Sequence, residues 1–207
     1  VQLTKNNDTY IRTFSWSPDA KKLVYTDRQN RICLLDVASK QKKVLLQDPL
    51  GEPREVSFSP DSKWLTYTRT SENDFSIVYV YNLETQKEYA VTDQWYSSSS
   101  PVFSTDGKYL IFSSARDFNP TYGQTEWNHV YTRMNGVYLA LLRQDTPSPF
   151  LEEDDEVTVQ TTEGTKEETS EEDTSVRIDI DGIADRFVKL LLSLSCYAHF
   201  YSYGYKV

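Results

Sequence analysis

One short turn occurs three times along the chain, and this repetition constrains the fold more than any other feature. Its copies are residues 16–19 (WSPD), 58–61 (FSPD) and 103–106 (FSTD), which start 42 and 45 residues apart. A lysine and then a strand rich in apolar and aromatic residues follow each copy. A period of about 40 to 45 residues in β-rich sequence is typical of a β-propeller, in which each repeat builds one four-stranded blade.

The turn itself has a local physical cause. Proline pre-sets φ at the first central position, and the aspartate that follows can accept a hydrogen bond from the backbone two residues on. In the third copy, Gly107 stands where a tight hairpin needs a positive φ. The sequence therefore predicts a tight turn between the first two strands of each blade.

The number of copies limits the size of the propeller. At about 43 residues per blade, 207 residues hold fewer than five blades, too few for a ring of six or seven. We therefore expect an all-β partial propeller, residues 1–207, made of four-stranded antiparallel blades. The expected blades are about 10–48, 55–93 and 101–190, the third with inserts at 115–135 and 145–175, and another blade begins near residue 197. Residues 1–4 resemble the end of a blade, so we expect a piece of a longer protein.

The expected strands follow from apolar and β-branched runs bounded by turn residues. They are 10–16, 22–27, 31–36 and 43–47; then 55–58, 64–69, 77–82 and 89–92; then 101–103, 109–113, 136–143, 176–180 and 186–190. The side chains of Asp36 and Asn82 are expected to cap the turns into the outer strands of the first two blades.

The net charge of −9 belongs to one segment. Residues 152–173 carry 11 acidic residues and one lysine, which leaves 20 acidic against 21 basic residues elsewhere. A near-neutral body argues against nucleic acid as a partner, because phosphate binding needs a basic surface. The acidic segment is rich in Glu, Thr and Ser and lacks aromatic residues, so we expect a disordered insert.

Cysteine spacing and hydropathy narrow the class of protein further. Cys33 and Cys196 fall on different expected blades and form neither a disulfide framework nor a metal-ligand spacing. We therefore expect two buried free thiols. No run of 18 apolar residues occurs in the sequence, so no membrane-spanning helix is expected.

The inserts of the third blade resemble a known family. Residues 116–122 (RDFNPTY), 126–128 (EWN), 145–150 (DTPSPF) and 178–186 (IDIDGIADR) are similar to the propeller region of tricorn-type serine proteases. The motifs span residues 116–190, and the repeated turn extends the likeness over most of the chain. The family then continues with a Leu-Pro pair and a Gly-containing turn, whereas residues 187–194 contain neither Pro nor Gly.

The resemblance implies a role in a larger enzyme. Such proteins are serine peptidases whose propellers precede a PDZ domain and a catalytic domain. It implies peptides as substrates, no cofactor, and the remaining propeller, PDZ and catalytic domains of the same protein as partners. It also implies the cytoplasm, or the periplasm where a signal peptide precedes the segment. Exposed blade faces would favour homo-oligomers.

The sequence offers no catalytic site of its own. Only His129 and His199 could serve as a general base, and no Gly-x-Ser-x-Gly nucleophile elbow occurs. Residues 97–100 (SSSS) are interpreted as a polar loop that enters an inner strand, and His129 as a loop histidine that packs locally. No metal site is expected, because the candidate carboxylates of the third blade lack the spacing of a calcium-binding loop. These carboxylates are Asp117, Glu126, Asp179, Asp181 and Asp185.

Three functions remain open at this point. A tricorn-like propeller would admit or release peptides by size through a central channel, with catalysis elsewhere in the protein. Its blade-three inserts would then lie on one face of the ring, against the catalytic domains or narrowing the channel. The alternatives are a TolB-type binding propeller with no peptidase, and the propeller of a prolyl-oligopeptidase-like enzyme. The sequence that follows residue 207 distinguishes the three.

Overall fold

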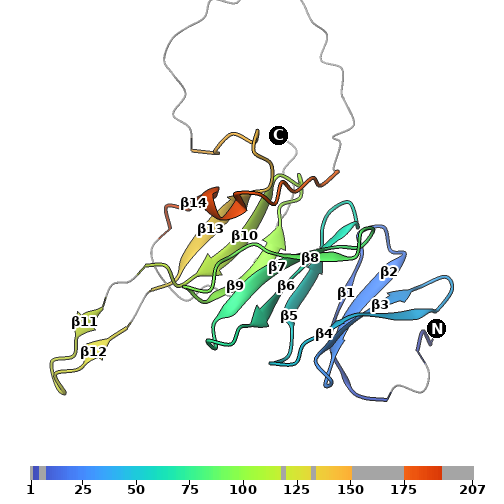
Figure 1. The fold of residues 1–207 in the computed structure, drawn as a ribbon, viewed down its shortest axis with the longest axis horizontal. Helices are drawn as coiled ribbons and strands as arrows, with labels where there is room; N and C mark the ends of the chain where they lie inside the picture. Colours follow the sequence, from blue (N-terminus) through green and yellow to red (C-terminus); the bar gives the residue numbers. More distant parts are fainter. Residues whose placement is uncertain (1, 5–7, 118–119, 132–133, 151–174, 193–207) are drawn as a thin grey trace, which may run out of the picture.

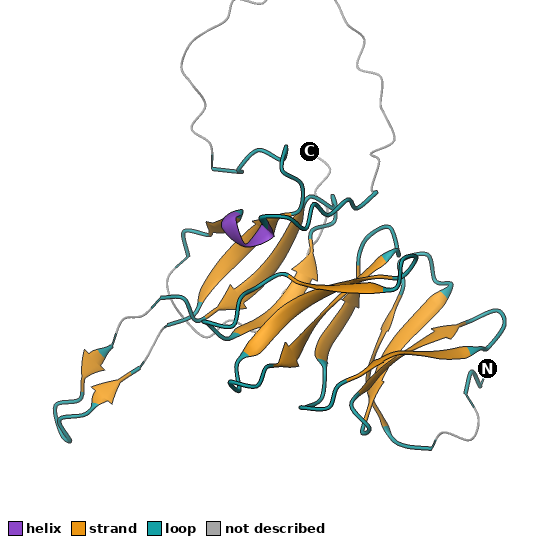
Figure 2. Ribbon diagram, viewed as in Figure 1, coloured by secondary structure: helices purple, strands orange, loops and turns teal. Residues whose placement is uncertain are grey.

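Three four-stranded antiparallel sheets stand side by side in the computed structural model, which describes residues 2–4, 8–117, 120–131, 134–150 and 175–192 (Figures 1 and 2). Each sheet is one blade, so the expected all-β partial propeller is confirmed. Blade 1 is β1 (Ile11–Trp16), β2 (Lys22–Asp27), β3 (Arg31–Asp36) and β4 (Lys42–Gln47). Blade 2 is β5 (Arg54–Phe58), β6 (Trp64–Thr70), β7 (Ser76–Asn82) and β8 (Lys87–Ala90). Blade 3 is β9 (Ser98–Phe103), β10 (Tyr109–Ser114), β13 (Gly136–Leu141) and β14 (Phe187–Lys189).

Two small elements belong to the inserts of blade 3. A hairpin of β11 (Thr121–Tyr122) and β12 (His129–Val130) lies within the first insert and projects away from the sheets (Figure 1). A single turn of 3-10 helix, η1 (Ile183–Asp185), precedes β14. No helix in the described ranges has the length and hydropathy that crossing a membrane requires.

The repeated turns share one hydrogen-bond pattern, built around the serine hydroxyl. In the first copy, Ser17 Oγ donates to Asp19 Oδ1 at 2.6 Å and accepts the Lys22 N–H at 2.9 Å. The Asp19 carboxylate also accepts the Lys21 N–H at 3.0 Å, as the sequence predicts. Ser59 and Ser104 make the equivalent bonds in the other two copies. The repeat is thus a closed local network that fixes each β-hairpin.

The core lies between blades, because side chains alternate across each strand. Leu65 and Tyr67 of β6 are fully buried against Val24 and Ile32 of blade 1. Trp64, on the opposite face of the same strand, packs in the cluster that joins blades 2 and 3. Burying a large apolar side chain stabilises a fold by roughly 1.5–3 kcal/mol. Central strands buried on both faces explain the continuous apolar runs in the sequence.

Three expected strands differ most from the structure. β9 begins at Ser98, so the interpretation of residues 97–100 as a loop is wrong for 98–100 and holds only for Ser97. Ser98 is buried and its hydroxyl bonds that of Ser114 at 3.0 Å, which makes a polar run acceptable inside the sheet. β8 covers 87–90 rather than 89–92, because Thr92 leaves the ladder and its Oγ1 accepts the Val78 N–H at 3.0 Å.

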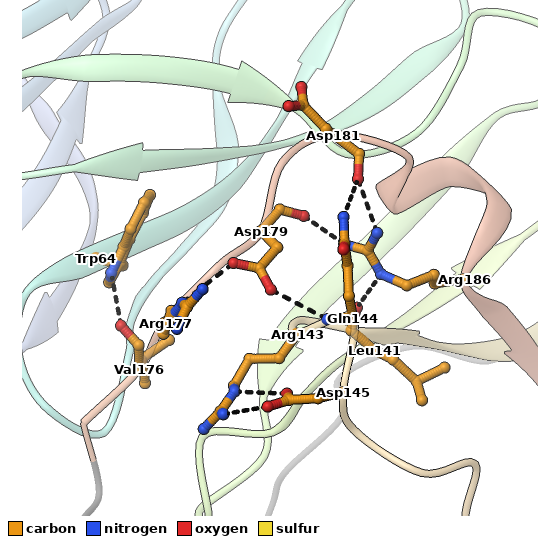
Figure 3. Close-up of polar contacts among 10 residues, drawn as sticks. All are labelled: Trp64, Leu141, Arg143, Gln144, Asp145, Val176, Arg177, Asp179, Asp181 and Arg186. Carbon is orange, nitrogen blue, oxygen red and sulfur yellow. Dashed lines mark hydrogen bonds and ion pairs between the residues drawn. The ribbon is translucent and has the colours of Figure 1, made fainter.

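The third difference is the segment 176–180, which is not a strand. It contacts blades 2 and 3 through side chains and through one backbone bond, from the Asp179 N–H to the Leu142 carbonyl at 2.8 Å (Figure 3). Trp64 Nε1 donates to the Val176 carbonyl at 3.1 Å, and Asp61 Oδ2 accepts the Val176 N–H at 2.9 Å. We name residues 175–186 the return segment, because they bring the chain back to the sheet after the second insert.

Some of the remaining expectations are confirmed, and others concern residues that the structure does not describe. Asp36 and Asn82 cap their turns, accepting the N–H groups of Ser39 and Thr85 at 2.8 Å. Cys33 is buried and free, as expected. The acidic tract, Cys196, His199 and the blade expected near residue 197 lie outside the described residues.

Candidate functional site

The inner strands of the three blades line one cavity of about 660 Å³. β1, β5 and β9 each contribute part of its wall, and they belong to three separate sheets. Apolar side chains on the wall include Phe14, Val56 and Val102. Phe14 is 67% exposed, so a large ring faces open space at this position. In a propeller the inner strands surround the central channel, and this cavity lies on that side.

Each inner strand carries a bulge at the same place. The ladder shifts register between Ile11 and Phe14 in β1, and between Arg54 and Ser57 in β5. β9 shifts in the same way between Ser99 and Val102. Bulges bend a strand and re-aim its side chains, and they are frequent beside functional sites. Here they turn side chains from all three blades toward the cavity.

The cavity wall carries charges of both signs. Arg12 Nη1 lies 2.6 Å from Glu52 Oε2, an ion pair between the first blade and the loop before β5. Arg54 and Glu55 follow directly on β5, and both are exposed. The wall therefore combines apolar side chains with charged ones, of which Arg12 and Glu52 are paired.

Glu55 fixes the relative position of blades 2 and 3 at this wall. Its Oε2 accepts the Ser100 N–H at 2.6 Å, and its Oε1 accepts the Ser100 hydroxyl at 3.1 Å. The Thr68 hydroxyl donates to the same carboxylate at 3.3 Å. Glu55 and Ser100 both have positive φ, at 57° and 54°, where their strands bulge. The bulged strands are therefore tied to one another through side chains as well as packing.

The structure does not bring together a nucleophile and a base within the described ranges. His129 lies in the projecting hairpin, where its ring contacts those of Tyr122 and Tyr131 at centroid distances of 4.9 and 6.4 Å. The cavity wall contains three serines, all on inner strands: Ser15, Ser57 and Ser100. Ser-type catalysis requires the base within hydrogen-bond reach of the hydroxyl.

The five candidate carboxylates are dispersed rather than clustered. Asp117 accepts the Tyr138 hydroxyl at 3.1 Å and also the Lys189 ammonium. Burial and then this carboxylate raise the pKa of Tyr138 to about 12. Glu126 is exposed on the hairpin. No group of three or more potential metal ligands occurs among the residues that the structure describes.

Asp179 and Asp181 serve the return segment (Figure 3). The Asp179 carboxylate accepts the Gln144 N–H at 3.1 Å and an N–H of Arg177 at 3.1 Å, which hold its pKa below the usual value. The Asp181 carboxylate points away from Gln144 and Arg177. The backbone carbonyl of Asp181 accepts a hydrogen bond from Arg186 Nη1 at 2.8 Å. Asp185 lies in η1. The Asp179 carboxylate is thus part of the scaffold.

Sequence reasoning missed the cavity wall, and it missed the hairpin in the first insert. The bulges could not be read from the sequence, because they depend on how each inner strand pairs with its neighbour. The hairpin had one available signal in the sequence. Ring-bearing residues occupy every second position of residues 127–131 (WNHVY), and Gly123 precedes them. That signal is short, since each strand of the hairpin contains two residues.

The whole chain matches one family model. Residues 1–207 match the tricorn protease second beta propeller domain.

Two curated relatives are similar over most of the chain. Tricorn protease homolog 1 of Streptomyces coelicolor is 27% identical over 182 residues, which are 88% of this chain and 17% of the relative. Tricorn protease of Thermoplasma volcanium is 25% identical over 139 residues, 64% of this chain and 14% of the relative.

A solved structure has the same fold. The crystal structure of the tricorn protease superposes with a TM-score of 0.75 over 95% of this chain, at 17% identity, and the match covers 18% of that chain. This chain thus spans less than a fifth of the length of each of these proteins.

Proposed function

The chain belongs to the family of the second β-propeller domain of tricorn proteases, and from that premise we propose that it is the non-catalytic propeller segment of a tricorn-like serine peptidase. Catalysis takes place in another domain of the polypeptide. This segment guides peptides toward that domain and selects them by size through the channel that its inner strands line. Peptides are the substrates, and the remaining propeller, PDZ and catalytic domains are the partners in the same protein.

The cavity between the inner strands is the observation that carries this proposal. Its wall combines apolar side chains with the Arg12–Glu52 pair, so it suits a peptide of mixed sequence better than a single chemical group. Glu55 ties two blades together at the wall, which favours a passage of fixed width. The relatives are named proteases, and the described part of this chain pairs no serine with a histidine base.

The first experiment separates guidance from catalysis. We expect the isolated 207-residue chain to hydrolyse no peptide, whereas the full-length polypeptide hydrolyses peptides and is stopped by a serine-directed inhibitor. Turnover by the isolated chain that the same inhibitor abolishes would contradict the non-catalytic role.

A separate experiment tests the cytoplasmic location that we propose for the full-length protein. Cells that express this protein are fractionated, and recovery of the protein from the periplasm would contradict that location.

The second experiment tests selection by size. Val102 faces the cavity, so Val102→Trp in the full-length polypeptide narrows the passage. We expect kcat/KM for long peptides to fall about tenfold, equivalent to ~1.4 kcal/mol of transition-state free energy, while dipeptide substrates are unaffected. Val44→Trp is the matched control, because Val44 is exposed on the outer strand β4. An equal effect on long and short substrates would contradict selection at this wall.

A further inference from the structure

The hairpin of β11 and β12 presents an aromatic surface outside the three blades. We name residues 120–131 the aromatic arm; it extends away from the sheets in Figures 1 and 2. Tyr122 pairs with His129 across the two strands, which places both rings on one face, in edge-to-face contact. The side chains of Tyr122, Trp127 and Tyr131 are 65%, 81% and 59% exposed. Clustered exposed rings of this kind are typical of an interaction surface.

Trp127 is held in a conformation that bulky residues rarely adopt. Its φ is 54°, in the left-handed region, where a side chain with a Cβ costs free energy. Strained backbone of this kind concentrates at binding and switch sites. Eight other non-glycine residues in the described ranges also have a positive φ, and Trp127 is the bulkiest of the nine.

The base of the arm is fixed by several elements. Asp117 accepts bonds from Tyr138 of β13 and Lys189 of β14. The neighbouring Arg116 pairs with Asp93 at 3.3 Å, and its guanidinium lies 4.9 Å from the Phe187 ring centroid. These contacts fix the edge of blade 3 from which the chain leaves toward the arm.

The chemistry of the arm selects the kind of partner. Residues 120–131 contain no lysine or arginine and one carboxylate, that of Glu126. A surface without cations suits neither nucleic acid nor an anionic membrane. Tyrosine and tryptophan are the side chains that contribute most at protein–protein contacts, where each fills an apolar pocket. The arm therefore fits an apolar groove on a protein.

The length of the relatives indicates which protein carries that groove. This chain covers 17% of tricorn protease homolog 1 and 18% of the tricorn protease of known structure, so other domains make up most of such a polypeptide. A partner tethered to the same chain is present at millimolar effective concentration. Its apparent binding affinity therefore exceeds that of a free partner by on the order of 10²–10⁴-fold. We propose that the aromatic arm docks into an apolar groove on another domain of the same polypeptide. This proposal does not depend on selection of peptides by the channel.

A photo-crosslinking experiment on the full-length polypeptide tests the proposal. Benzoylphenylalanine replaces Trp127 in one variant and Gln124, an exposed polar position on the same arm, in the control. Heavy and light isotopic copies are mixed before irradiation, and the crosslinked peptides are identified by mass spectrometry. We expect position 127 to link to one surface outside residues 1–207 of the same copy, at several times the yield of position 124.

Each other outcome overturns the proposal. Links between heavy and light copies would identify a second copy as the partner. Links confined to residues 1–207 would place the arm on its own propeller. Equal, scattered links from positions 127 and 124 would mean that the arm has no fixed partner.

A second measurement uses natural side chains and does not depend on turnover. In the full-length polypeptide, Trp127→Ala should raise the rate of hydroxyl-radical oxidation of Tyr122 about tenfold, as expected when ~1.4 kcal/mol of docking free energy is lost. Trp95→Ala, which removes a tryptophan that is 79% exposed outside the arm, should leave that rate unchanged. The same oxidation rate in wild type and in Trp127→Ala would overturn docking through this ring.

Discussion

At the residue scale, the repeated turn places one residue in the left-handed region in every blade. The position is Ala20 in blade 1, Ser62 in blade 2 and Gly107 in blade 3, with φ of 57°, 60° and 69°. Gly107 thus has the positive φ that the sequence predicts. An L-residue with a Cβ at such a φ costs about 1–2 kcal/mol, whereas glycine pays mainly through the entropy of the unfolded chain. The three turns are therefore natural variants of one another.

This equivalence gives a prediction in both directions. Gly107→Ala should lower the free energy of unfolding of the chain by about 1 kcal/mol, because it adds a Cβ at positive φ. Ala20→Gly should leave it unchanged or raise it by up to about 1 kcal/mol, since Ala20 is exposed and its side chain is not needed for packing. Urea unfolding followed by tryptophan fluorescence measures both. A loss of stability in Ala20→Gly similar to that in Gly107→Ala would contradict this account.

The same turn makes stability depend on acid. The Ser17 hydroxyl and the Lys21 N–H hold the pKa of Asp19 below its ordinary value of 3.8. A carboxylate with a lowered folded-state pKa stabilises the fold fully above its unfolded-state pKa, and this stabilisation is lost as pH falls through the folded-state value. We expect Asp19→Asn to lessen the decrease in unfolding midpoint between about pH 5 and about pH 2.

A serine variant provides the control for this acid dependence. Ser17→Ala retains the carboxylate but removes its main donor, so it should also lessen the decrease. If both variants lose stability with acid as steeply as the wild type, the turn network does not contribute to acid sensitivity.

At the element scale, the return segment is organised by one arginine. The Arg186 guanidinium donates to the carbonyls of Leu141, Asp179 and Asp181, and its backbone carbonyl accepts the Leu141 N–H at 3.0 Å (Figure 3). One of these carbonyls belongs to β13, and the other two directly precede the tight turn at Gly182, which has φ of 69°. One planar side chain thus ties the return segment to β13, alongside the backbone bond from the Asp179 N–H to the Leu142 carbonyl at 2.8 Å.

Replacing that arginine tests its role. Arg186→Lys keeps the charge but cannot reach three carbonyls at once, because an ammonium lacks the planar fork of a guanidinium. We expect the free energy of unfolding to fall by about 1–3 kcal/mol, because two partly buried carbonyls, those of Leu141 and Asp179, lose a donor. The segment 175–186 should also become the preferred site of limited proteolysis. Arg177→Lys is the control, because the Arg177 side chain is 70% exposed and should tolerate the change.

At the scale of the whole molecule, a partly buried charge network joins blade 1 to blade 2. Arg69 of β6 donates to Asp48, which follows β4, at 2.6 Å, and to Glu88 of β8 at 2.7 Å. The Tyr67 hydroxyl donates to Glu88 at 2.5 Å, and burial together with this carboxylate raises the pKa of Tyr67. The Asp48 side chain is fully buried. One cation thus pairs with two carboxylates where the two blades meet.

Breaking this network should separate the blades. Arg69→Met should cost about 3–5 kcal/mol, because it leaves the Asp48 carboxylate buried without a cation. Arg143→Met removes the exposed pair with Asp145 and should cost less than about 1 kcal/mol. Calorimetry of the two variants compares them. Equal costs would mean that the junction between blades does not depend on Arg69.

Local interactions explain why so much of this fold could be predicted from sequence. The serine, aspartate and backbone groups of each turn lie within six residues of one another, and strand alternation repeats every two residues. β2 and β3 therefore coincide with the expected strands. The inner strand β9 begins at Ser98, before the expected start at residue 101, because the burial of Ser98 depends on its partner Ser114.

The sequence by itself determined the period, the turn chemistry and hence an open array of three blades with two inserts in the third. Tertiary structure alone decided the cavity between the inner strands, the position of the return segment and the exposed rings of the aromatic arm. The physical reason is the distance along the chain. Trp64 and Asp61 bond Val176 across 112 and 115 residues, and Glu55 bonds Ser100 across 45. No local pattern specifies such pairs, which form only when the blades pack.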